Sequence, residues 1–400
     1  MRERVLYISY DGRLEPLGQS QVLAYLEKLA PGRVIHLISF EKSDDFKDVA
    51  QREAIDRRMG NAGIVWHPLR YHKYPTASAT AYDVGQGSAL AVALILRHRL
   101  HVVHARSYVA GLMALAAKRA AGAKFVFDMR GFWADERVDG HLWPHGGRLY
   151  RAAKTVERRL LLAADHVVTL TQAAEAELRT FNYLQRSIPP ISVIPTCADL
   201  ERFNIRERQQ NQPFVLGYVG SVGTWYLLDE MLRCFQLLRV ELPTARLLIV
   251  NRGQHDMIQT SVRRSALPET DLDLVSATHA EMPLMIARMN AGMALYEPSY
   301  SRLACAPTKL AEYLACGVPC LGAAQVGDME SVLEDRKVGV ALRGFSDAEL
   351  RPAVRRLLAL TRESGIRKRC RKVAEDLFAV AHAVRAYARI YEELSRGRMA

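Results

Sequence analysis

The feature that most constrains this chain is a repeated alternation of short apolar runs with helical patterns. The apolar runs of the first half are Val5–Ser9, Val34–Phe40, Ile64–Leu69, Val102–Ser107, Lys124–Arg130 and His166–Thr171. Most of them are separated by segments with helical periodicity. Continuous apolar strands that alternate with helices predict a parallel sheet covered on both faces.

The same pattern restarts after a proline-rich passage, residues 187–205, which surrounds one short strand at Ser192–Ile194 and is the expected linker. Its later strands are Val215–Ser221, Arg246–Asn251 and the runs DLVSA, AGMALY, VPCLGA and VGVAL, with a helix near Leu227–Arg239. A chain of 400 residues also exceeds what one core usually serves. The sequence predicts an α/β protein of two Rossmann-like domains, residues 1–186 and 206–375, facing each other across a cleft, and a final helix within 376–400.

The amino-acid composition limits the classes of binding partner but does not identify one. The net charge of +12 suits an anionic partner, but charges of both signs are interspersed, so nucleic acid is not expected. The six cysteines fit neither a dense disulfide framework nor paired zinc ligands, which predicts buried thiols. The N-terminal apolar run is too short for a signal peptide, and no stretch suggests a membrane span. We expect a cytoplasmic protein, with peripheral membrane contact left open.

Ligands of open parallel sheets lie beyond the carboxyl ends of the strands, which directs attention to the segment Tyr296–Cys320. Pro307 is expected at the first position of a helix whose start would attract an anion such as a diphosphate. Lys309 adds a positive charge in the first turn, and Glu312, a turn later, could accept hydrogen bonds from a ribose. The alternative is a capped helix with a solvated lysine and glutamate.

The segment Ala306–Cys320, APTKLAEYLACGVPC, resembles the donor-binding motif of glycosyltransferase family 4, the retaining enzymes with the GT-B fold, in the branch whose motif reads S-P-T-K-L-x-E-Y-L-A-x-G-x-P. Similarity extends to VIPTCADLERF (193–203), VLGYVGSVGTWYLLDEMLRCF (215–235) and ADHVVTLTQ (164–172), and YDGRLEPLGQSQV (10–22) replaces the family's glycine-rich first loop. The resemblance implies transfer from a UDP- or GDP-linked sugar to a saccharide or polyprenyl-diphosphate-linked acceptor, without cofactor or metal. It also implies that the final helix packs back on the N-terminal domain.

Carried over by position, Glu312 matches the second glutamate of the family's E-x7-E motif, whereas the first falls at Ala304. The Arg and Lys of the family's phosphate loop are replaced by the residues 220–224. We therefore expect backbone amides there to share the diphosphate with Arg252 and Lys309, with Arg302 in reserve. The expected donor site comprises Gly18, Ser221, Gly223, Thr224, Arg252, Pro307, Thr308, Lys309 and Glu312.

A second group of polar residues follows strands of the first half. Asp128 and Arg130 end one strand; the family commonly has histidine at position 130, and an arginine there cannot act as a general base. Arg130 is expected to bind a phosphate or to pair with Asp128. The expected catalytic residues are Lys309, Arg252, Arg130 and Asp128, and the expected acceptor-side residues are Gln19, His104, Arg106, Phe132, Trp133, Asp135 and Glu136.

Most acceptor-side assignments have a structural alternative: an N-cap in a tight turn for Gln19, a core position for His104 and the aromatics, and salt bridges for Asp135 and Glu136. Two basic segments are also left open. The helix Arg148–Arg159 could be a solvated face or could contact anionic lipid or a lipid-diphosphate acceptor. The run Arg367–Lys372 is expected to be solvated helix surface.

The absence of certain motifs argues against two other classes of enzyme. The only D-x-D, Asp271 and Asp273, precedes a strand, which favours metal-independent transfer. No G-x-G-x-x-G follows Ser9, which disfavours an NAD-dependent oxidoreductase. A sugar-nucleotide epimerase, or an inactive GT-B scaffold in view of Ala304, remains an alternative.

Overall fold

The computed structural model describes residues 2–15, 18–207 and 212–396, and the chain divides into two compact units. One unit contains Met1–Pro195 and Val380–Ala400, and the other contains Thr196–Ala379. The first crossing between them lies inside the expected linker, and the second follows the last helix of the C-terminal unit. Residues 397–400 of the expected final helix lie outside the described residues.

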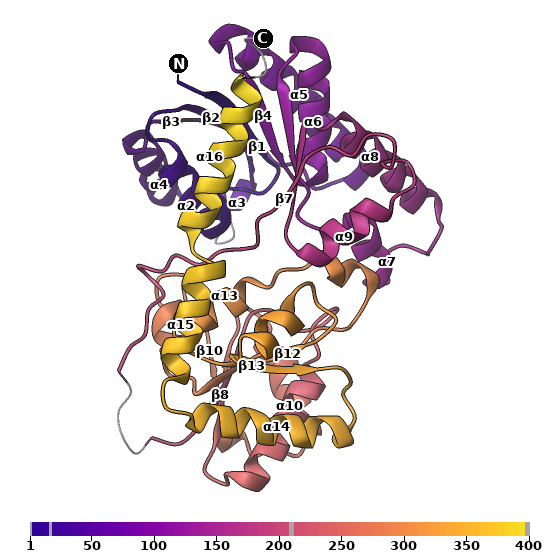
Figure 1. Cartoon of the computed structure of the whole chain (residues 1–400). Coiled ribbons are helices and arrows are strands. Elements are labelled where there is room, and N and C mark those ends of the chain that lie inside the picture. Colours follow the sequence, from indigo (N-terminus) through magenta and orange to yellow (C-terminus); the bar gives the residue numbers. More distant parts are fainter. Residues whose placement is uncertain (1, 16–17, 208–211, 397–400) are drawn as a thin grey trace. The chain divides into compact units, whose positions relative to one another are not determined.

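The N-terminal unit contains one parallel sheet in the order β3-β2-β1-β4-β5-β6-β7. Its strands are β1 Arg4–Ser9, β2 Val34–Glu41, β3 Ile64–Arg70, β4 Val102–Arg106, β5 Lys124–Asp128, β6 His166–Thr169 and β7 Ile191–Val193. Its helices are η1 Gln19–Leu23, α2 Ala24–Leu29, α3 Ser43–Lys47, α4 Val49–Asn61, α5 Thr76–His98, α6 Ser107–Ala121, α7 Trp133–Asp139, α8 Arg148–Ala163, α9 Gln172–Thr180 and α16 Val380–Arg396. Helices α5, α6 and α8 pack together in one layer, and α16 packs on α2 and β4 (Figure 1).

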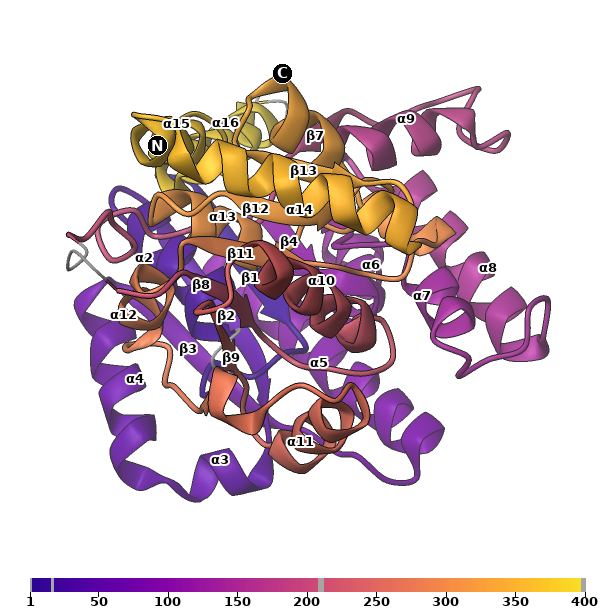
Figure 2. The same ribbon diagram turned by 90° about the horizontal axis from the view of Figure 1, so that it is seen from below.

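The C-terminal unit contains a second parallel sheet in the order β10-β9-β8-β11-β12-β13. Its strands are β8 Val215–Val219, β9 Arg246–Val250, β10 Leu272–Val275, β11 Ala291–Ala294, β12 Cys320–Ala323 and β13 Gly339–Leu342. Its helices are α10 Leu228–Glu241, α11 His255–Arg264, η2 Glu269–Asp271, α12 Met282–Ala287, η3 Tyr300–Ala304, α13 Thr308–Ala315, η4 Ser331–Asp335, α14 Asp347–Arg362 and α15 Ile366–Leu377. The unit has two apolar clusters, one with residues of α13 and α15 and one with residues of α10 and α14. In Figure 2, α10 and α14 lie in front of the strands.

The prediction of two parallel α/β sheets is confirmed, and every apolar run named from the sequence overlaps a strand. The final helix expected within 376–400 begins later than its first expected residue: α15 ends at Leu377, and α16 runs from Val380 to Arg396. The break coincides with the point where Ala379 pairs with Ala198 and the Phe378 carbonyl accepts a hydrogen bond from the Ala198 N–H, at 2.8 Å. None of the six cysteines forms a disulfide, and five of them are buried.

Helix α5 modifies the expectation that no stretch is long and apolar enough to span a membrane. It has 23 residues with a mean hydropathy of 1.3 over its most apolar window, of which 33% is buried inside the unit. A core helix of a soluble domain has the same length and composition, and α5 packs on α6, where Gly87 approaches Met113. Its buried Asp83 accepts a hydrogen bond from the Tyr10 hydroxyl at 2.7 Å. Length and hydropathy are therefore weak evidence for a span here.

Candidate functional site

The start of α13 lies beyond the carboxyl end of β11, at the loop that connects β11 to β12. Pro307 is the N-cap residue, with φ −65° and ψ 119°, and not the first helical residue as the sequence suggested. The helix therefore begins at Thr308. No side chain caps this helix start and no acidic residue occupies its first turn. The first-turn N–H groups have no intrahelical partners, so this end of the helix favours an anion.

Lys309 is enclosed by tyrosines contributed by three segments. Its side chain is only 8% exposed, and its Nζ lies 3.0 Å from the Tyr218 hydroxyl oxygen. The ammonium also lies 4.1, 4.6 and 5.2 Å from the ring centroids of Tyr218, Tyr226 and Tyr296. Ring faces stabilise an ammonium ion, but they carry no net negative charge. Lys309 is thus buried without a carboxylate within ion-pair distance in the described part of the chain.

Burial shifts the pKa values of Lys309 and Glu312 toward their neutral forms. Desolvation lowers the pKa of Lys309 to about 7, with Glu312 among the weaker opposing influences. Desolvation also raises the pKa of Glu312 to about 8, opposed by Lys309 and Arg202. A ligand that brings a negative charge to Lys309 and hydroxyl donors to Glu312 would stabilise both charged forms. A diphosphate attached to a ribose has this combination.

The loop that follows β8 lies beside the Lys309 ammonium. A side-chain Cβ at Gly220 would lie 3.1 Å from Lys309 Nζ, so glycine leaves room there for the amine. The Tyr218 hydroxyl, which accepts from Lys309, donates to the Ser221 carbonyl. Gly220, Gly223 and Thr224 all have positive φ, at 128°, 84° and 55°. The structure therefore brings the expected phosphate loop and Lys309 together.

Two side chains that the sequence analysis did not single out hold this loop in place. Gln254 donates from Nε2 to the Val222 carbonyl at 2.8 Å and accepts at Oε1 from the Val222 N–H at 3.0 Å. Asn251 donates from Nδ2 to the Gly220 carbonyl at 2.9 Å. The Val222 N–H is consequently bonded to Gln254 and is not available to a ligand. It is therefore removed from the backbone amides of this loop that were expected to bind the diphosphate. In the sequence, only their position directly after the strand β9 indicated that Asn251 and Gln254 could lie near a ligand site.

The remaining donor-side residues differ in how firmly they are held. Arg252 is exposed on the loop after β9, with no hydrogen bond or ion pair to its side chain among the described residues. Arg302 is buried, and its guanidinium lies 5.3 Å from the Trp225 ring centroid. Ala304, where the family's first glutamate would fall, is buried in η3. Of the two arginines, Arg302 is therefore the one whose position is fixed by its surroundings, although the sequence analysis expected Arg252 to bind the diphosphate first.

In the N-terminal unit, His104 and Asp128 form a buried core with two tyrosines of α16. His104 Nδ1 lies 2.6 Å from the Tyr391 hydroxyl, and its Nε2 lies 3.6 Å from Asp128 Oδ2. Asp128 accepts a hydrogen bond from Tyr387 at 3.1 Å and lies 3.7 Å from Arg130 Nη1. Burial raises the pKa of Asp128, but Arg130 and His104 more than offset it and leave that pKa lowered. His104 is therefore a core histidine whose own pKa is lowered by burial.

Several expected acceptor-side residues are structural. Phe132 is fully buried and cannot be a ligand platform. Trp133 packs 5.7 Å from Tyr108 and 5.3 Å from Trp143, measured between ring centroids. Asp135 is buried and accepts hydrogen bonds from Tyr150 at 2.9 Å and Lys154 at 3.0 Å, so it joins α7 to α8. The salt-bridge alternative holds for Asp135.

Three further expected residues lie against the backbone. Gly18 is buried, and a Cβ there would lie 1.9 Å from the Gly12 carbonyl oxygen, so glycine permits two chain segments to touch. Gln19 donates to the Leu14 carbonyl at 3.4 Å. Glu136 lies beside Gly131, where a Cβ would be 2.8 Å from its Oε1. These contacts show a role in shaping the loops after β1 and β5.

The D-x-D aspartates are committed to arginines. Asp271 pairs with Arg239, and Asp273 pairs with Arg246 at 2.5 Å and with Arg288 at 2.9 Å. The described residues contain no cluster of three His, Cys, Asp or Glu side chains that could hold a metal ion.

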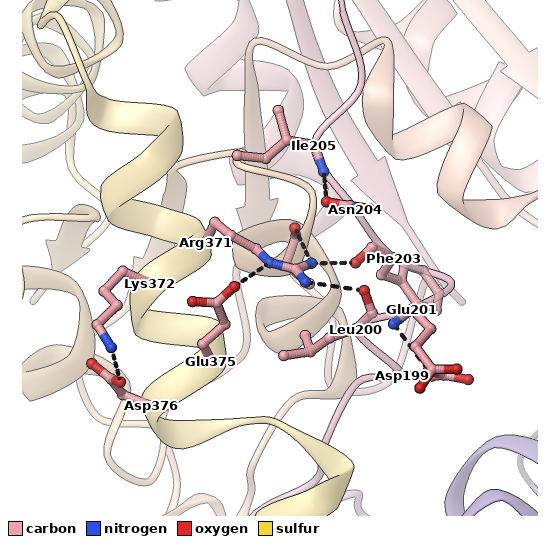
Figure 3. A network of polar contacts seen from close by, with 11 residues as sticks. Asp199, Leu200, Glu201, Phe203, Asn204, Ile205, Arg371, Lys372, Glu375 and Asp376 are labelled. Carbon is pink, nitrogen blue, oxygen red and sulfur yellow. Dashed lines mark hydrogen bonds and ion pairs between the residues drawn. The ribbon is translucent and has the colours of Figure 1, made fainter.

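Arg371 corrects the expectation that the run Arg367–Lys372 is solvated surface. Its guanidinium donates to the carbonyls of Phe203 at 2.6 Å, Leu200 at 3.1 Å and Ala315 at 3.2 Å, and it pairs with Glu375 (Figure 3). Ala315 is the last residue of α13. Arg371 thus fixes the C-terminal end of the helix that carries Lys309 and Glu312.

Comparisons with known proteins bear on this geometry. Residues 34–197 match the family model described as a glycosyl transferase 4-like domain, a range that does not include the Lys309 segment. No characterised protein sequence matches significantly. Sucrose-phosphate synthase from Thermosynechococcus elongatus superposes with a TM-score of 0.71 at 16% identity, over 99% of this chain and 100% of that one. The chain has the GT-B fold.

Two other GT-B structures are similar over nearly their whole length. Anabaena HepE in complex with UDP and glucose matches with a TM-score of 0.67 and 16% identity, over 98% of this chain and 100% of its own. The lipopolysaccharide outer core galactosyltransferase WaaB matches with a TM-score of 0.65 and 12% identity, over 97% and 99%. At these identities the likeness shows the GT-B fold and leaves the activity of this chain to be proposed.

Proposed function

We propose that this GT-B protein is a retaining, metal-independent glycosyltransferase that uses a UDP- or GDP-linked sugar as donor. The observation that carries the proposal is Lys309, buried at an uncapped helix start without a counter-charge and one turn before the buried Glu312. The match of residues 34–197 to the glycosyl transferase 4-like domain and the UDP complex of HepE support it. The acceptor is a saccharide or a polyprenyl-diphosphate-linked saccharide in surface polysaccharide or glycoconjugate synthesis.

The chemistry requires stabilisation of a leaving diphosphate. As the anomeric C–O bond breaks, negative charge grows on the phosphate oxygen, and a lysine and helix amides fixed in a dry site stabilise it without reorganisation. Binding of the diphosphate returns Lys309 to its charged form. In the retaining reaction proposed here, the acceptor hydroxyl attacks from the face that the diphosphate leaves. The departing phosphate oxygen takes the hydroxyl proton.

The reaction is tested first by binding and then by turnover. A panel of nucleoside diphosphate sugars is screened for thermal stabilisation, because a ligand that binds only the folded state raises the melting temperature. The sugar nucleotide that stabilises most is then supplied with acceptor extracts, with and without EDTA. We expect transfer with retained anomeric configuration, unaffected by EDTA. No stabilisation by any nucleotide sugar would refute the donor role.

The same assay separates the alternatives. Release of an isomerised sugar nucleotide without acceptor would indicate an epimerase. Nucleotide binding with no transfer to any acceptor would indicate an inactive scaffold. Both outcomes contradict the proposed transfer while keeping the nucleotide site.

We further propose a cytoplasmic protein that binds peripherally to the inner face of the plasma membrane through α8. Arg148, Arg151 and Arg159 are exposed on this helix together with Leu162, at spacings that place them on one face. Exposed arginines beside an exposed leucine suit an anionic lipid surface.

A further inference from the structure

We infer that the N-terminal unit has an oxyanion site of its own, built by Arg106, Arg130 and the start of α6, that receives a phosphoryl group. The inference rests on the proposed function because it assigns this phosphoryl group to a substrate of glycosyl transfer. The group is a phosphate of the acceptor.

Arg106 is a buried cation with an incomplete set of partners. It is the last residue of β4 and is 5% exposed, and its Nε and Nη1 atoms are buried without a hydrogen-bond partner among the described residues. The carboxylate closest to it is Asp11, with Oδ2 3.5 Å from Nε, and Asp11 is 48% exposed. A buried guanidinium with unsatisfied N–H groups is costly unless a ligand completes it. The unsatisfied atoms are the donors that an oxyanion needs.

Arg106 lies among two further arginines and three carboxylates: Arg13, Arg130, Asp11, Glu41 and Asp128. Arg106 is in register with Ser9 of β1 and with Asp128 of β5, so these strand ends are adjacent. Arg13, fully buried in the loop after β1, binds Ser9 Oγ at 2.7 Å and the carbonyls of Asp11 and Gly18. All three bonds go to neutral groups. Burial lowers the pKa of Arg13 to about 10, and the positive charge of Arg106 contributes to the lowering.

The buried carboxylates nearby are already engaged. Asp128 lies between Arg130 and His104. Glu41 accepts from the backbone N–H groups of Arg13 and Leu14 and from the Ser39 hydroxyl. Half-exposed Asp11 is the remaining carboxylate at Arg106. In the described part of the chain, no fully buried carboxylate therefore pairs with Arg106 alone.

The backbone supplies an independent observation at the same strand ends. Ser107 has φ 71° and Arg130 has φ 64°, although neither is glycine. Such residues are uncommon, and they cluster at ligand and catalytic sites where the surroundings enforce them. Ser107 is also the first residue of α6, whose 15 residues begin without a side-chain cap or an acidic residue in the first turn. The uncapped N–H groups of this helix thus start next to the unsatisfied guanidinium.

The test separates this site from the donor site by working in a Lys309→Met background. Inorganic pyrophosphate is titrated against the full chain by calorimetry and thermal shift. We expect Lys309→Met to keep pyrophosphate binding, and Lys309→Met/Arg106→Met to lose it by about tenfold or more, as for a charge-assisted hydrogen bond. Arg119, exposed at the far end of α6, gives the matched control Lys309→Met/Arg119→Met, which should bind as the background does.

A second readout distinguishes a ligand role from a structural one. Because Arg106 has a half-exposed carboxylate as its ion-pair partner and two buried nitrogen atoms without a hydrogen bond, Arg106→Met should melt no lower than wild type, whereas a structural arginine would melt lower when removed. If that variant fails to fold, Arg106→Lys keeps the charge with fewer donors and should bind pyrophosphate more weakly. Equal pyrophosphate affinity with and without Arg106 overturns the inference.

Saturation of wild type with the nucleoside diphosphate identifies the source of the phosphoryl group. If pyrophosphate still binds and its binding still depends on Arg106, the site serves a phosphorylated acceptor. If the nucleotide abolishes Arg106-dependent binding, the assignment to a phosphorylated acceptor is overturned. Failure of the chain to bind any nucleotide sugar would refute the proposed function while leaving Arg106-dependent pyrophosphate binding measurable.

Discussion

At the scale of single residues, Lys309 and Glu312 determine how the C-terminal unit responds to a donor. We expect Lys309→Met to reduce kcat/KM by about 100-fold or more, the usual effect of removing one group that stabilises a developing oxyanion. The variant should stay folded, because a buried amine without a carboxylate is replaced by an apolar chain of similar length. Lys372→Met, at an exposed position of α15, is the matched control. Near-normal turnover of Lys309→Met would contradict the phosphate role.

The lowered pKa of Lys309 gives this site a pH dependence. Below about pH 7 the free lysine is already charged, and above it binding of a diphosphate must take up a proton. The affinity for the nucleotide sugar, divided by that for its nucleoside, should therefore be flat below pH 7 and fall above it. Division by the nucleoside affinity removes the contribution of Glu312 to ribose binding. Lys309→Met should flatten the profile, and a slope that persists would assign the proton elsewhere.

Glu312 should make the stability of the protein pH-dependent in the opposite direction to most carboxylates. Its pKa is raised from 4.5 in the unfolded chain to about 8 in the folded one, so the folded state binds the extra proton between these values. The free energy of unfolding therefore falls as pH rises through this window. Glu312→Gln lacks the ionisation, so it should gain melting temperature relative to wild type from pH 5 to pH 8.5. A constant difference across that range would show that Glu312 is not buried as a neutral acid.

The sequence could identify these two residues because they lie in one short helical motif with a family resemblance. It could not predict their environment. Tyr218, Tyr226 and Tyr296, which surround Lys309, come from a strand and two loops that only the folded sheet brings together. The same limitation explains why Asp135 was expected at a ligand site: its partners Tyr150 and Lys154 lie on another helix.

At the scale of elements, the loop after β8 depends on the loop after β9. We expect Gln254→Leu to weaken donor binding by about tenfold, because it removes both hydrogen bonds to Val222, each worth about 1 kcal/mol. Hydrogen exchange of the Val222 amide should become faster while the strands of the sheet keep their protection. Thr260→Val, at an exposed position of α11, is the control. Unchanged exchange at Val222 would contradict the role of Gln254.

Helix α8 gives an element-scale test of the membrane proposal. Reversing Arg148, Arg151 and Arg159 to glutamate should reduce binding to phosphatidylglycerol vesicles by about 1 kcal/mol per arginine, with little change on phosphatidylcholine vesicles. The same reversal at Arg57, Arg97 and Arg119, exposed on other helices, is the matched control. Transfer to a soluble acceptor should be unchanged. Equal loss of vesicle binding in both triple variants would indicate a general charge effect and contradict a specific role for α8.

At the scale of the whole molecule, the repeated strand–helix pattern was sufficient to predict two parallel sheets and to place the first crossing within the linker. The second crossing was not predictable from periodicity, because the helical pattern continues almost unbroken from α15 into α16. What ends α15 is the pairing of Ala379 with Ala198, a contact between residues far apart in sequence. The return of α16 then supplies Tyr387 and Tyr391 to a core built around His104 and Asp128.

This division predicts two separable thermal transitions that respond to different perturbations. Tyr391→Phe leaves the buried His104 Nδ1 without its partner, which should cost about 1–3 kcal/mol in the N-terminal unit alone. The nucleotide sugar should raise the transition of the C-terminal unit, which contains Lys309, by the same amount in wild type and in Tyr391→Phe. Tyr82→Phe, at an exposed tyrosine of α5, is the control for loss of a hydroxyl. Multidomain chains depart from two-state unfolding when their units have independent cores, as these two sheets do. A single transition in calorimetry, shifted as a whole by both the substitution and the ligand, would show that the units unfold together and would contradict this prediction.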